Sequence, residues 1–155
     1  MLKTKSKLGL ADVAVAKRQI TNPFLDKINN IVDWDPIEKK INIAYSKGKR
    51  IDGRPAFPGL LLFKICLLKE WYNIPQWRLY LIVSDSISFT HFTGMSLDDE
   101  VPSLTTIQKF KIELSRKGLF SELLDDVSQS LSSHHLQIKK GITRHPILLR
   151  KATTD

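Results

Sequence analysis

Apolar residues recur at the three- to four-residue spacing of amphipathic helices along most of this 155-residue chain. The stretch "DDEVPSLTTIQKFKIELSRKG", residues 98–118, is one clear case. Ser103, directly after Pro102, is a suitable N-cap, and Gly118 is a suitable C-cap. The apolar stripe between them consists of Leu104, Ile107, Phe110 (or Ile112) and Leu114. The pattern predicts a helix over about residues 103–117 with a polar outer face.

A second segment, which begins at Pro58, predicts the central helix of the molecule. Its apolar residues continue to about Tyr72 and occupy nearly the whole circumference of a helix. A helix that is apolar on all sides is buried among other helices. The chain's single cysteine, Cys66, lies within this run, and we expect it to be a buried apolar side chain rather than a nucleophile.

Helices are also predicted on both sides of the central one. Asn22 before Pro23 and Asp35 before Pro36 are N-cap signals for two upstream helices. Downstream, the segments "NIPQWRLYLIVSD", "SISFTHFTG" and "LFSELLDDVSQSLSSH" predict three more, the last with an acidic outer face. No alternating pattern typical of strands precedes residue 136. The fold class is therefore predicted to be all-α, a helical bundle.

The helical signal divides the chain into three parts. Residues 1–21 carry little apolar periodicity and several lysines, and are predicted to be a basic flexible arm. Residues 22–135 form the predicted helical domain, which contains one Gly- and Pro-rich loop, "KGKRIDGRPAFPG". Residues 136–155 are predicted to be a divergent tail, which departs from the family pattern described below.

Positive charge is concentrated in particular segments. The formal net charge is +8 and the isoelectric point is near 9.6, which favours a polyanionic partner such as nucleic acid. One basic cluster lies in the predicted loop, where the candidate contacts are Lys49, Arg50 and Arg54. For Arg54, a salt bridge that braces the loop is the alternative. Another cluster lies at residues 109–117.

The polar face of the predicted 103–117 helix supplies the other candidate contacts. Thr and Gln side chains can hydrogen-bond to base edges, and Lys and Arg can neutralise phosphates. In helix-turn-helix proteins such side chains lie on the recognition helix, so a helix-turn-helix-like element is expected here. An ordinary solvated surface is the alternative interpretation of this face. The candidate contacts are Thr105, Thr106, Gln108, Lys109, Arg116 and Lys117.

Catalytic, metal-binding and membrane-spanning residues are not expected in the chain. The acidic run 98–100 is interpreted as a solvated turn, because neighbouring residues in one loop do not converge on one metal pair. His134 and His135 have no partners at a recognised metal-ligand spacing. The apolar run 60–68 is interrupted by Lys64 and is shorter than the ~20 residues that a membrane span requires.

Taken in order, several of these segments resemble the N-terminal domain of bacterial insertion-sequence transposases of the InsH type. The matching segments are "GRP", the apolar helix after it, "SISFTHFTGMSLDDEVP" and "SLTTIQKFKIEL", and they agree in order and spacing over about residues 22–141. The resemblance implies an all-α DNA-binding domain that recognises transposon terminal inverted repeats. In that family a ribonuclease-H-like domain follows, in which Asp-Asp-Glu holds two divalent metals for strand cleavage and transfer.

The chain departs from the family pattern after "IKKG". The family pattern leads there into a strand with a Val-Asp-Ala-Thr-like motif, which carries the first catalytic Asp. This chain reads "ITRHPILLRKATTD" instead. The resemblance therefore implies a transposase fragment, truncated before the catalytic domain and not itself an enzyme. A frameshift or premature stop is one origin of such a tail.

Two functions are consistent with the sequence. The first is a DNA-binding fragment whose partner is double-stranded DNA with terminal inverted repeats, at the bacterial nucleoid in the cytoplasm. The second is a protein-interaction module that forms a homodimer or binds intact transposase as an inhibitor. Exposed aromatic rings at Trp71, Tyr72, Trp77 and Tyr80 would support the second function, whereas rings that fill the core would not. A product without a selectable function is a third alternative; no cofactor and no membrane partner is expected.

Overall fold

The structure, a computed structural model, describes residues 9–17, 22–45, 57–141 and 146–151. The helices are α1 (Leu10–Lys17), α2 (Pro23–Ile31), α3 (Trp34–Ala44), α4 (Gly59–Trp71), α5 (Gln76–Asp85), α6 (Ile87–Thr93), α7 (Leu104–Arg116) and α8 (Leu119–Ser132). Two short strands follow, β1 (Leu136–Lys139) and β2 (Ile147–Arg150). The predicted helical body is therefore confirmed. Within the described ranges, no helix combines the length and the apolar character needed to cross a bilayer.

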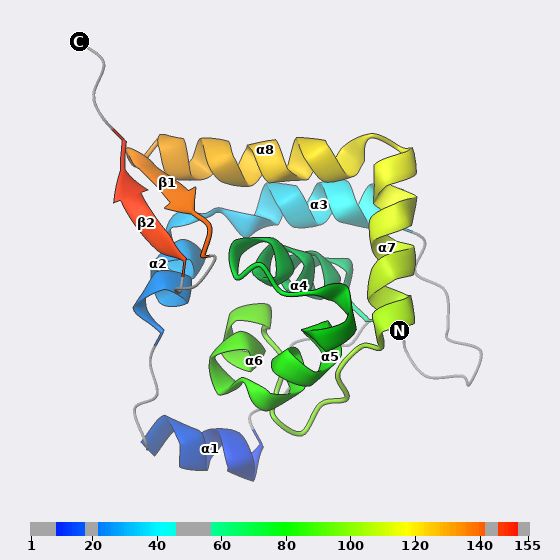
Figure 1. Cartoon of the computed structure of the whole chain (residues 1–155), viewed down its shortest axis with the longest axis vertical. Helices are drawn as coiled ribbons and strands as arrows, with labels where there is room; N and C mark the ends of the chain where they lie inside the picture. Colours follow the sequence, from blue (N-terminus) through cyan, green and yellow to red (C-terminus); the bar gives the residue numbers. More distant parts are fainter. Residues whose placement is uncertain (1–8, 18–21, 46–56, 142–145, 152–155) are drawn as a thin grey trace.

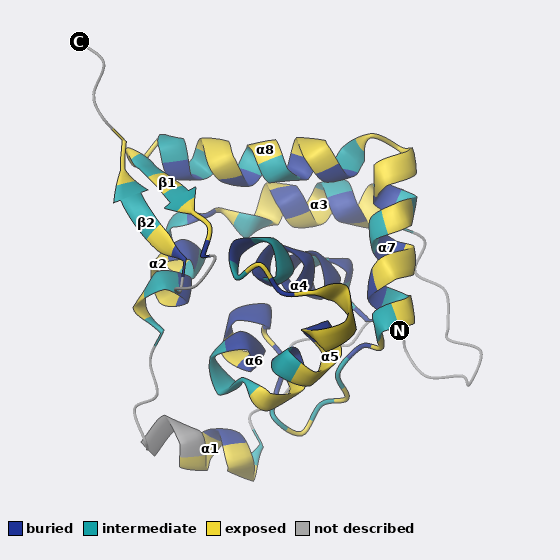
Figure 2. Ribbon diagram, viewed as in Figure 1, coloured by how far each residue is buried: buried dark blue, intermediate teal, exposed yellow. Residues whose placement is uncertain are grey.

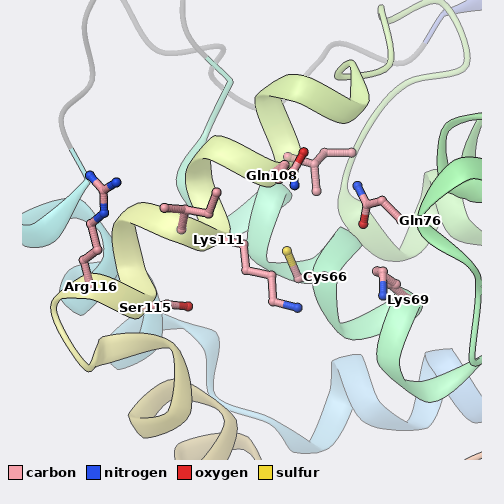
Figure 3. Close-up of a pocket in the computed structure, with 9 residues that line it drawn as sticks. Cys66, Lys69, Gln76, Gln108, Lys111, Ser115 and Arg116 are labelled. Carbon is pink, nitrogen blue, oxygen red and sulfur yellow. The ribbon is translucent and has the colours of Figure 1, made fainter.

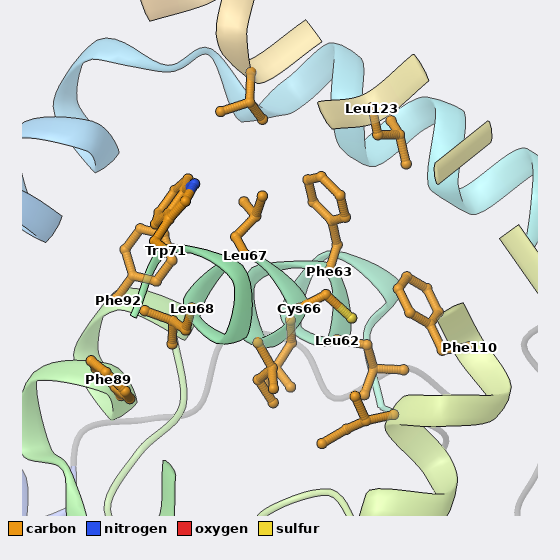
Figure 4. Packing of buried hydrophobic residues seen from close by; sticks show 14 of the residues in the cluster. Leu62, Phe63, Cys66, Leu67, Leu68, Trp71, Phe89, Phe92, Phe110 and Leu123 are labelled. Atoms are coloured by element: carbon orange, nitrogen blue, oxygen red, sulfur yellow. The ribbon is translucent and has the colours of Figure 1, made fainter. Parts of the chain in front are cut away.

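Helix α4 is the central element of the fold, as its apolar circumference predicts. Helices α3 and α8 lie along one side of it, α5 and α6 cover the other side, and α7 lies across one end (Figure 1). All residues of α4 between 61 and 68 are buried, including the charged Lys64 (Figure 2). Figure 4 shows the side chains that meet around α4: Phe63 and Leu67 from α4, Leu123 from α8, Phe110 from α7, and Phe89 and Phe92 from α6.

The start of α4 lies very close to α3. A Cβ atom added to Gly59 would overlap Cγ2 of Ile41, a core residue of α3. Glycine, which has no Cβ, lets the backbone of α4 approach the Ile41 side chain this closely. The contact places α3 against the first turn of α4.

Most of the capping residues predicted from sequence hold their helix ends. Asn22 accepts a hydrogen bond from the backbone N of Leu25 at 3.1 Å, and Pro23 occupies the first position of α2. Helix α6 ends at Gly94, whose φ of +82° is the left-handed conformation that glycine adopts without strain. These local signals correctly place the start of α2 and the end of α6.

The predicted cap of α3 is wrong by two residues. Asp33, not Asp35, is the N-cap, and its Oδ1 accepts a hydrogen bond from the backbone N of Asp35 at 3.2 Å. Pro36 then lies within the first turn, where a missing backbone N–H costs nothing because that group has no partner inside the helix. The proline signal is therefore compatible with a helix that begins earlier.

Helix α1 lies within the segment predicted to be a flexible arm. It occupies an outer edge of the molecule and is held by the buried carboxylate of Asp12 (Figure 1). This carboxylate accepts hydrogen bonds from Ser96 Oγ, from Leu97 N at 3.1 Å and from Gly9 N at 2.9 Å, and these bonds lower the pKa of Asp12. The remainder of the predicted arm, residues 1–8 and 18–21, lies outside the described residues.

The predicted tail contains an antiparallel strand pair. Leu136 of β1 lies opposite Arg150 of β2, and β1 packs against α8. The backbone N of Gly141 donates a hydrogen bond to the carbonyl oxygen of Trp71 at 3.0 Å, which attaches the hairpin to the end of α4. The strands were not predicted from the sequence.

Candidate nucleic-acid interface

Helix α7 is fixed at both ends and along its inner side. Ser103 Oγ accepts a hydrogen bond from the backbone N of Thr106 at 3.2 Å, as predicted. Gly118, with φ of +66°, follows the C-cap Lys117 and turns the chain into α8. The apolar stripe is also confirmed: Phe110 is fully buried and its ring lies 5.0 Å from that of Tyr45. Ile107 and Leu114 complete the buried side.

The outer side of α7 brings together four of the six contacts predicted on this helix. Successive residues of a helix are rotated by about 100°, so residues three and four apart share a face. Figure 2 shows exposed residues along the side of α7 that points away from the core. We call this surface the α7 face; it consists of Thr105, Gln108, Lys109, Ile112 and Arg116.

The other two predicted contacts, Thr106 and Lys117, lie on a different flank of α7. Thr106 Oγ1 is hydrogen-bonded to Ser103 Oγ at 3.0 Å, as part of the N-terminal cap. Lys117 donates a hydrogen bond to the carbonyl oxygen of Ala44 in α3, and its Nζ lies 3.7 Å from Oε1 of Glu113. Both side chains therefore have partners within the protein.

The loop contacts Lys49, Arg50 and Arg54 lie outside the described residues. The last described residue before this segment is Tyr45, which packs on Phe110 of α7. The three loop residues remain sequence-based predictions.

A groove of about 540 Å³ lies beside the α7 face, between α7, α4 and α5 (Figure 3). Among the described residues that line it there are three cations, two amides and one hydroxyl, but no carboxylate. We call it the cationic groove. Its lining residues are Cys66, Lys69, Gln76, Ile107, Gln108, Lys111, Ile112, Ser115 and Arg116. The groove is therefore rich in hydrogen-bond donors and complementary to an anion.

Glu70, next to the groove, orients one of its cations. Nζ of Lys111 lies 3.8 Å from Oε1 of Glu70, and Nζ of Lys140 lies 3.3 Å from Oε2 of the same carboxylate. Lys111 also lies 5.3 Å from the ring centroid of Phe120. Partly exposed pairs of this kind are weak, about 0–1 kcal/mol each. Lys111 is therefore positioned by α4 and α8 but is not neutralised by a strong ion pair.

The thiol at the base of the groove is chemically inert. Cys66 is buried, as predicted, and burial raises the pKa of its thiol to about 12. A protonated thiol is a poor nucleophile. The groove thus offers binding groups rather than a reactive group.

The acidic run 98–100 lies in the connection between α6 and α7, apart from the groove. Oδ2 of Asp99 accepts a hydrogen bond from the backbone N of Ser96 at 2.9 Å. The run is thus part of a turn, in agreement with the interpretation made from sequence.

Sequence reasoning did not assign four groove residues: Lys69, Gln76, Lys111 and Ser115. The helical phase of α7 was sufficient to place Lys111 and Ser115 beside Gln108. Lys69 and Gln76 come from α4 and α5, about thirty to forty residues earlier in the chain. No local pattern connects them to α7, because the groove arises only when the three helices pack together.

The four aromatic residues considered for a protein interface divide into two pairs. Trp71 is only 5% exposed, and the half-buried Tyr72 packs on Phe89 with ring centroids 4.7 Å apart. Trp77 of α5, in contrast, is 76% exposed, and Tyr80 is also exposed. The first pair fills the core, and the second pair forms part of the surface near the cationic groove.

The chain matches a known protein family. The family described as transposase domain (DUF772) matches residues 14–113, a range that includes α2 to α6 and most of α7. The α7 face falls inside the matched range except for Arg116. No solved structure matches the chain.

Proposed function

The chain belongs to the DUF772 family of transposase domains, and from this premise we propose that its helical body is a DNA-binding domain that recognises transposon terminal inverted repeats. The family connects the protein with transposition. The α7 face and the cationic groove support DNA as the partner. We also propose the InsH type for this domain and the bacterial nucleoid as its place of action.

The observation that carries the proposal is the α7 face. It presents Thr105 and Gln108, which can bond to base edges, followed along the same face by the cations Lys109 and Arg116. An α-helix with side chains is about 10–12 Å across, and the major groove of B-DNA is about 12 Å wide. In this arrangement α7 enters the major groove while the cationic groove lies over the adjacent phosphates.

Helix α7 then has the role of a recognition helix in a helix-turn-helix-like element. The connection from α6 to α7 spans residues 94–103, longer than the three- to four-residue turn of the standard motif. We therefore propose that α7 acts like the recognition helix of a helix-turn-helix motif, although the connection before it is longer than in the standard motif. Lys49, Arg50 and Arg54 are proposed as further phosphate contacts.

We propose that this chain binds DNA without cutting it. The groove and the α7 face supply donors and cations, whereas two-metal strand cleavage requires acidic ligands that converge on a metal pair. In this proposal the chain contributes DNA recognition, and the strand cleavage that the resemblance implies belongs to a ribonuclease-H-like domain.

A DNA titration tests the proposal. The purified chain is titrated with a duplex of its own element's terminal repeat and with a scrambled duplex of equal length, at two salt concentrations. We expect tighter binding to the repeat than to the scrambled duplex. The logarithm of the binding constant should fall with the logarithm of the salt concentration, with a slope of about −0.9 for each phosphate that the chain neutralises. Equal binding to both duplexes would exclude sequence recognition.

The double variant Lys109→Ala/Arg116→Ala tests the assigned face. We expect it to lose affinity and to make the salt slope less negative by about 1.8. The control variant Lys27→Ala/Lys39→Ala removes the same charge from exposed positions on α2 and α3. If both double variants weaken binding equally, the effect is due to net charge and the assignment of α7 is wrong.

A second candidate function, a dimerisation or inhibitor module, is favoured by α1. Leu10 is 91% exposed and Val13 is also exposed, so this helix presents apolar side chains to solvent. Apolar association is weakly salt-dependent, whereas DNA binding weakens steeply with salt. Sedimentation of the chain with and without intact transposase, at two salt concentrations, distinguishes the two functions.

A further inference from the structure

Helix α5 exposes a strip of large side chains next to the cationic groove. Trp77, Tyr80 and Leu81 are all exposed, and we call them the α5 strip. The other two tryptophans of the chain pack inward. Trp71 is buried, and the half-buried Trp34 packs edge-to-face against Phe92, with ring centroids 6.1 Å apart. The exposed indole of Trp77 therefore does not contribute to the core.

Helical geometry places the strip along the edge of the groove. Leu79 and Val83 are the buried side of α5. Gln76 lines the groove, and Tyr80 lies about one turn further along nearly the same face, because residues four apart differ by only about 40° around a helix. Trp77 and Leu81 occupy the next strip outward. The rings thus begin at the edge of the groove and continue over the outer surface of α5.

A cation accompanies the exposed indole. The guanidinium carbon of Arg78 lies 5.5 Å from the centroid of the Trp77 ring. With Lys69, Lys111 and Arg116 in the groove, this side of the molecule combines four cations with two exposed aromatic rings. Proteins that hold single-stranded nucleic acid combine a cationic groove for the backbone with aromatic side chains on which bases stack.

We propose that the α5 strip binds unpaired nucleotides of the DNA that α7 holds. Their bases stack on Trp77 and Tyr80, and their phosphates lie in the cationic groove. The inference rests on the proposed DNA-binding function and adds a ligand to it. An intact duplex does not supply this ligand, because its base faces are covered by neighbouring base pairs; an unpaired base offers a free face.

Charge favours a nucleic acid over an apolar protein surface as the occupant. A protein that covered the strip would also cover part of the groove, where three cations lie among lining residues that include no carboxylate in the described part of the chain. Lys111 pairs only weakly with Glu70, at 3.8 Å. Burying Lys69 and Arg116 without anionic partners is unfavourable. A nucleic acid satisfies both requirements, because its phosphates pair with the cations of the groove while its bases stack on the aromatic rings of the strip.

The test compares three DNA probes of one sequence: the blunt duplex, the duplex with a short single-stranded extension, and the single strand alone. The proteins are the full chain, Trp77→Ala, Trp77→Phe and, as a matched control, Ile43→Ala, which shortens an exposed apolar side chain on α3. We expect the extension to tighten binding by about fivefold or more, with quenching of the indole fluorescence. Trp77→Ala should lose this preference and keep blunt-duplex affinity, and Trp77→Phe and Ile43→Ala should retain it.

The outcomes separate this inference from the proposed function. Blunt-duplex binding with no preference for the extension, or with a preference that Trp77→Ala retains, overturns the role of the strip and leaves the DNA-binding function intact. Trp77-dependent binding of the single strand without duplex binding supports the strip and overturns duplex recognition. If Trp77→Ala changes the oligomeric state and not the DNA affinities, the strip is a protein contact and the inference is wrong.

Discussion

Lys64 of α4 donates a hydrogen bond from Nζ to the backbone carbonyl oxygen of Phe92 in α6, at 3.1 Å. The same nitrogen donates to Oδ1 of Asn29 in α2 at 3.1 Å and lies 4.5 Å from the centroid of the Trp34 ring. One ammonium group thus links α4 to three other helices, α6, α2 and α3, through neutral oxygens and an aromatic face. Burial lowers the pKa of Lys64 to about 8, because the charged form loses its hydration.

The first prediction is that the chain becomes more stable between pH 8 and pH 9. Unfolded lysine keeps its proton up to about pH 10.5, whereas folded Lys64 releases it near 8, so the unfolded state binds more protons in this interval. The free energy of unfolding should then rise by about 1 kcal/mol. Urea denaturation at pH 7, 8 and 9 measures it.

Two variants isolate the contribution of Lys64. Lys64→Met should abolish the rise. Cys66 lowers the free energy of unfolding as the pH rises above 9.0, because its buried thiol keeps a proton that the unfolded thiol loses. In Cys66→Ala the rise should therefore continue towards pH 10.5. An unchanged rise in Lys64→Met would show that another group titrates.

The second prediction concerns the close approach of α3 and α4. Gly59→Ala places a methyl group against Ile41, so one helix must shift or the Ile41 side chain must move. Overpacking of this kind costs about 1–3 kcal/mol. Chemical denaturation of Gly59→Ala, beside the exposed control Gln129→Ala, measures the loss. If Gly59→Ala is as stable as the control, the two helices are not in tight contact.

The third prediction concerns the attachment of α1. Asp12→Ala removes the acceptor for Ser96 Oγ, Leu97 N and Gly9 N. We expect faster hydrogen exchange and proteolysis within residues 9–17, with little change in the stability of α2 to α8. The exposed control Asp85→Ala should change neither.

The same attachment should depend on acidity. The pKa of Asp12 is lowered in the folded chain, so the stabilisation is complete above the ordinary value of 3.8 and is lost as the pH falls through the lower folded value. The hydrogen-exchange protection factor of α1, which is corrected for the pH dependence of intrinsic exchange, should fall at that acid limit. A protection factor that is already lost at neutral pH would contradict the role of the carboxylate.

The fourth prediction places a negative charge on the α7 face. Ile112 is 43% exposed between Gln108 and Arg116, and Ile112→Glu should weaken DNA binding by about tenfold, a change of ~1.4 kcal/mol. The matched control is Ile43→Glu on α3, where the native side chain is 88% exposed. Fluorescence anisotropy with a labelled duplex measures both. Equal losses would indicate a general charge effect rather than a defined interface.

Local signals were sufficient to predict the helical body. The caps at Asn22 and Ser103 depend on residues three positions away, so they can be recognised in the sequence alone. The unbroken apolar run of α4 likewise predicts its central place. Helix α1 was missed because its main anchor, Asp12, binds a residue 84 positions away.

The interface was only partly predictable for the same reason. The sequence assigned six contacts to the polar face of α7, and four of them, Thr105, Gln108, Lys109 and Arg116, do share one face. Thr106 and Lys117 lie on a different flank. Periodicity cannot show that Lys117 bonds to the carbonyl of Ala44, 73 positions earlier. The walls that α4 and α5 contribute to the cationic groove depend on tertiary packing in the same way.

The last turn of α4 carries three consecutive residues that contact the cationic groove, α7 and the hairpin. Lys69 lines the cationic groove, Glu70 pairs with Lys111 and Lys140, and the carbonyl of Trp71 accepts from Gly141. Inserting or deleting one residue just before Lys69 would rotate all three by about 100° relative to the rest of α4 and misplace α7 and the hairpin together. This segment should therefore accept changes of side chain much more readily than changes of length.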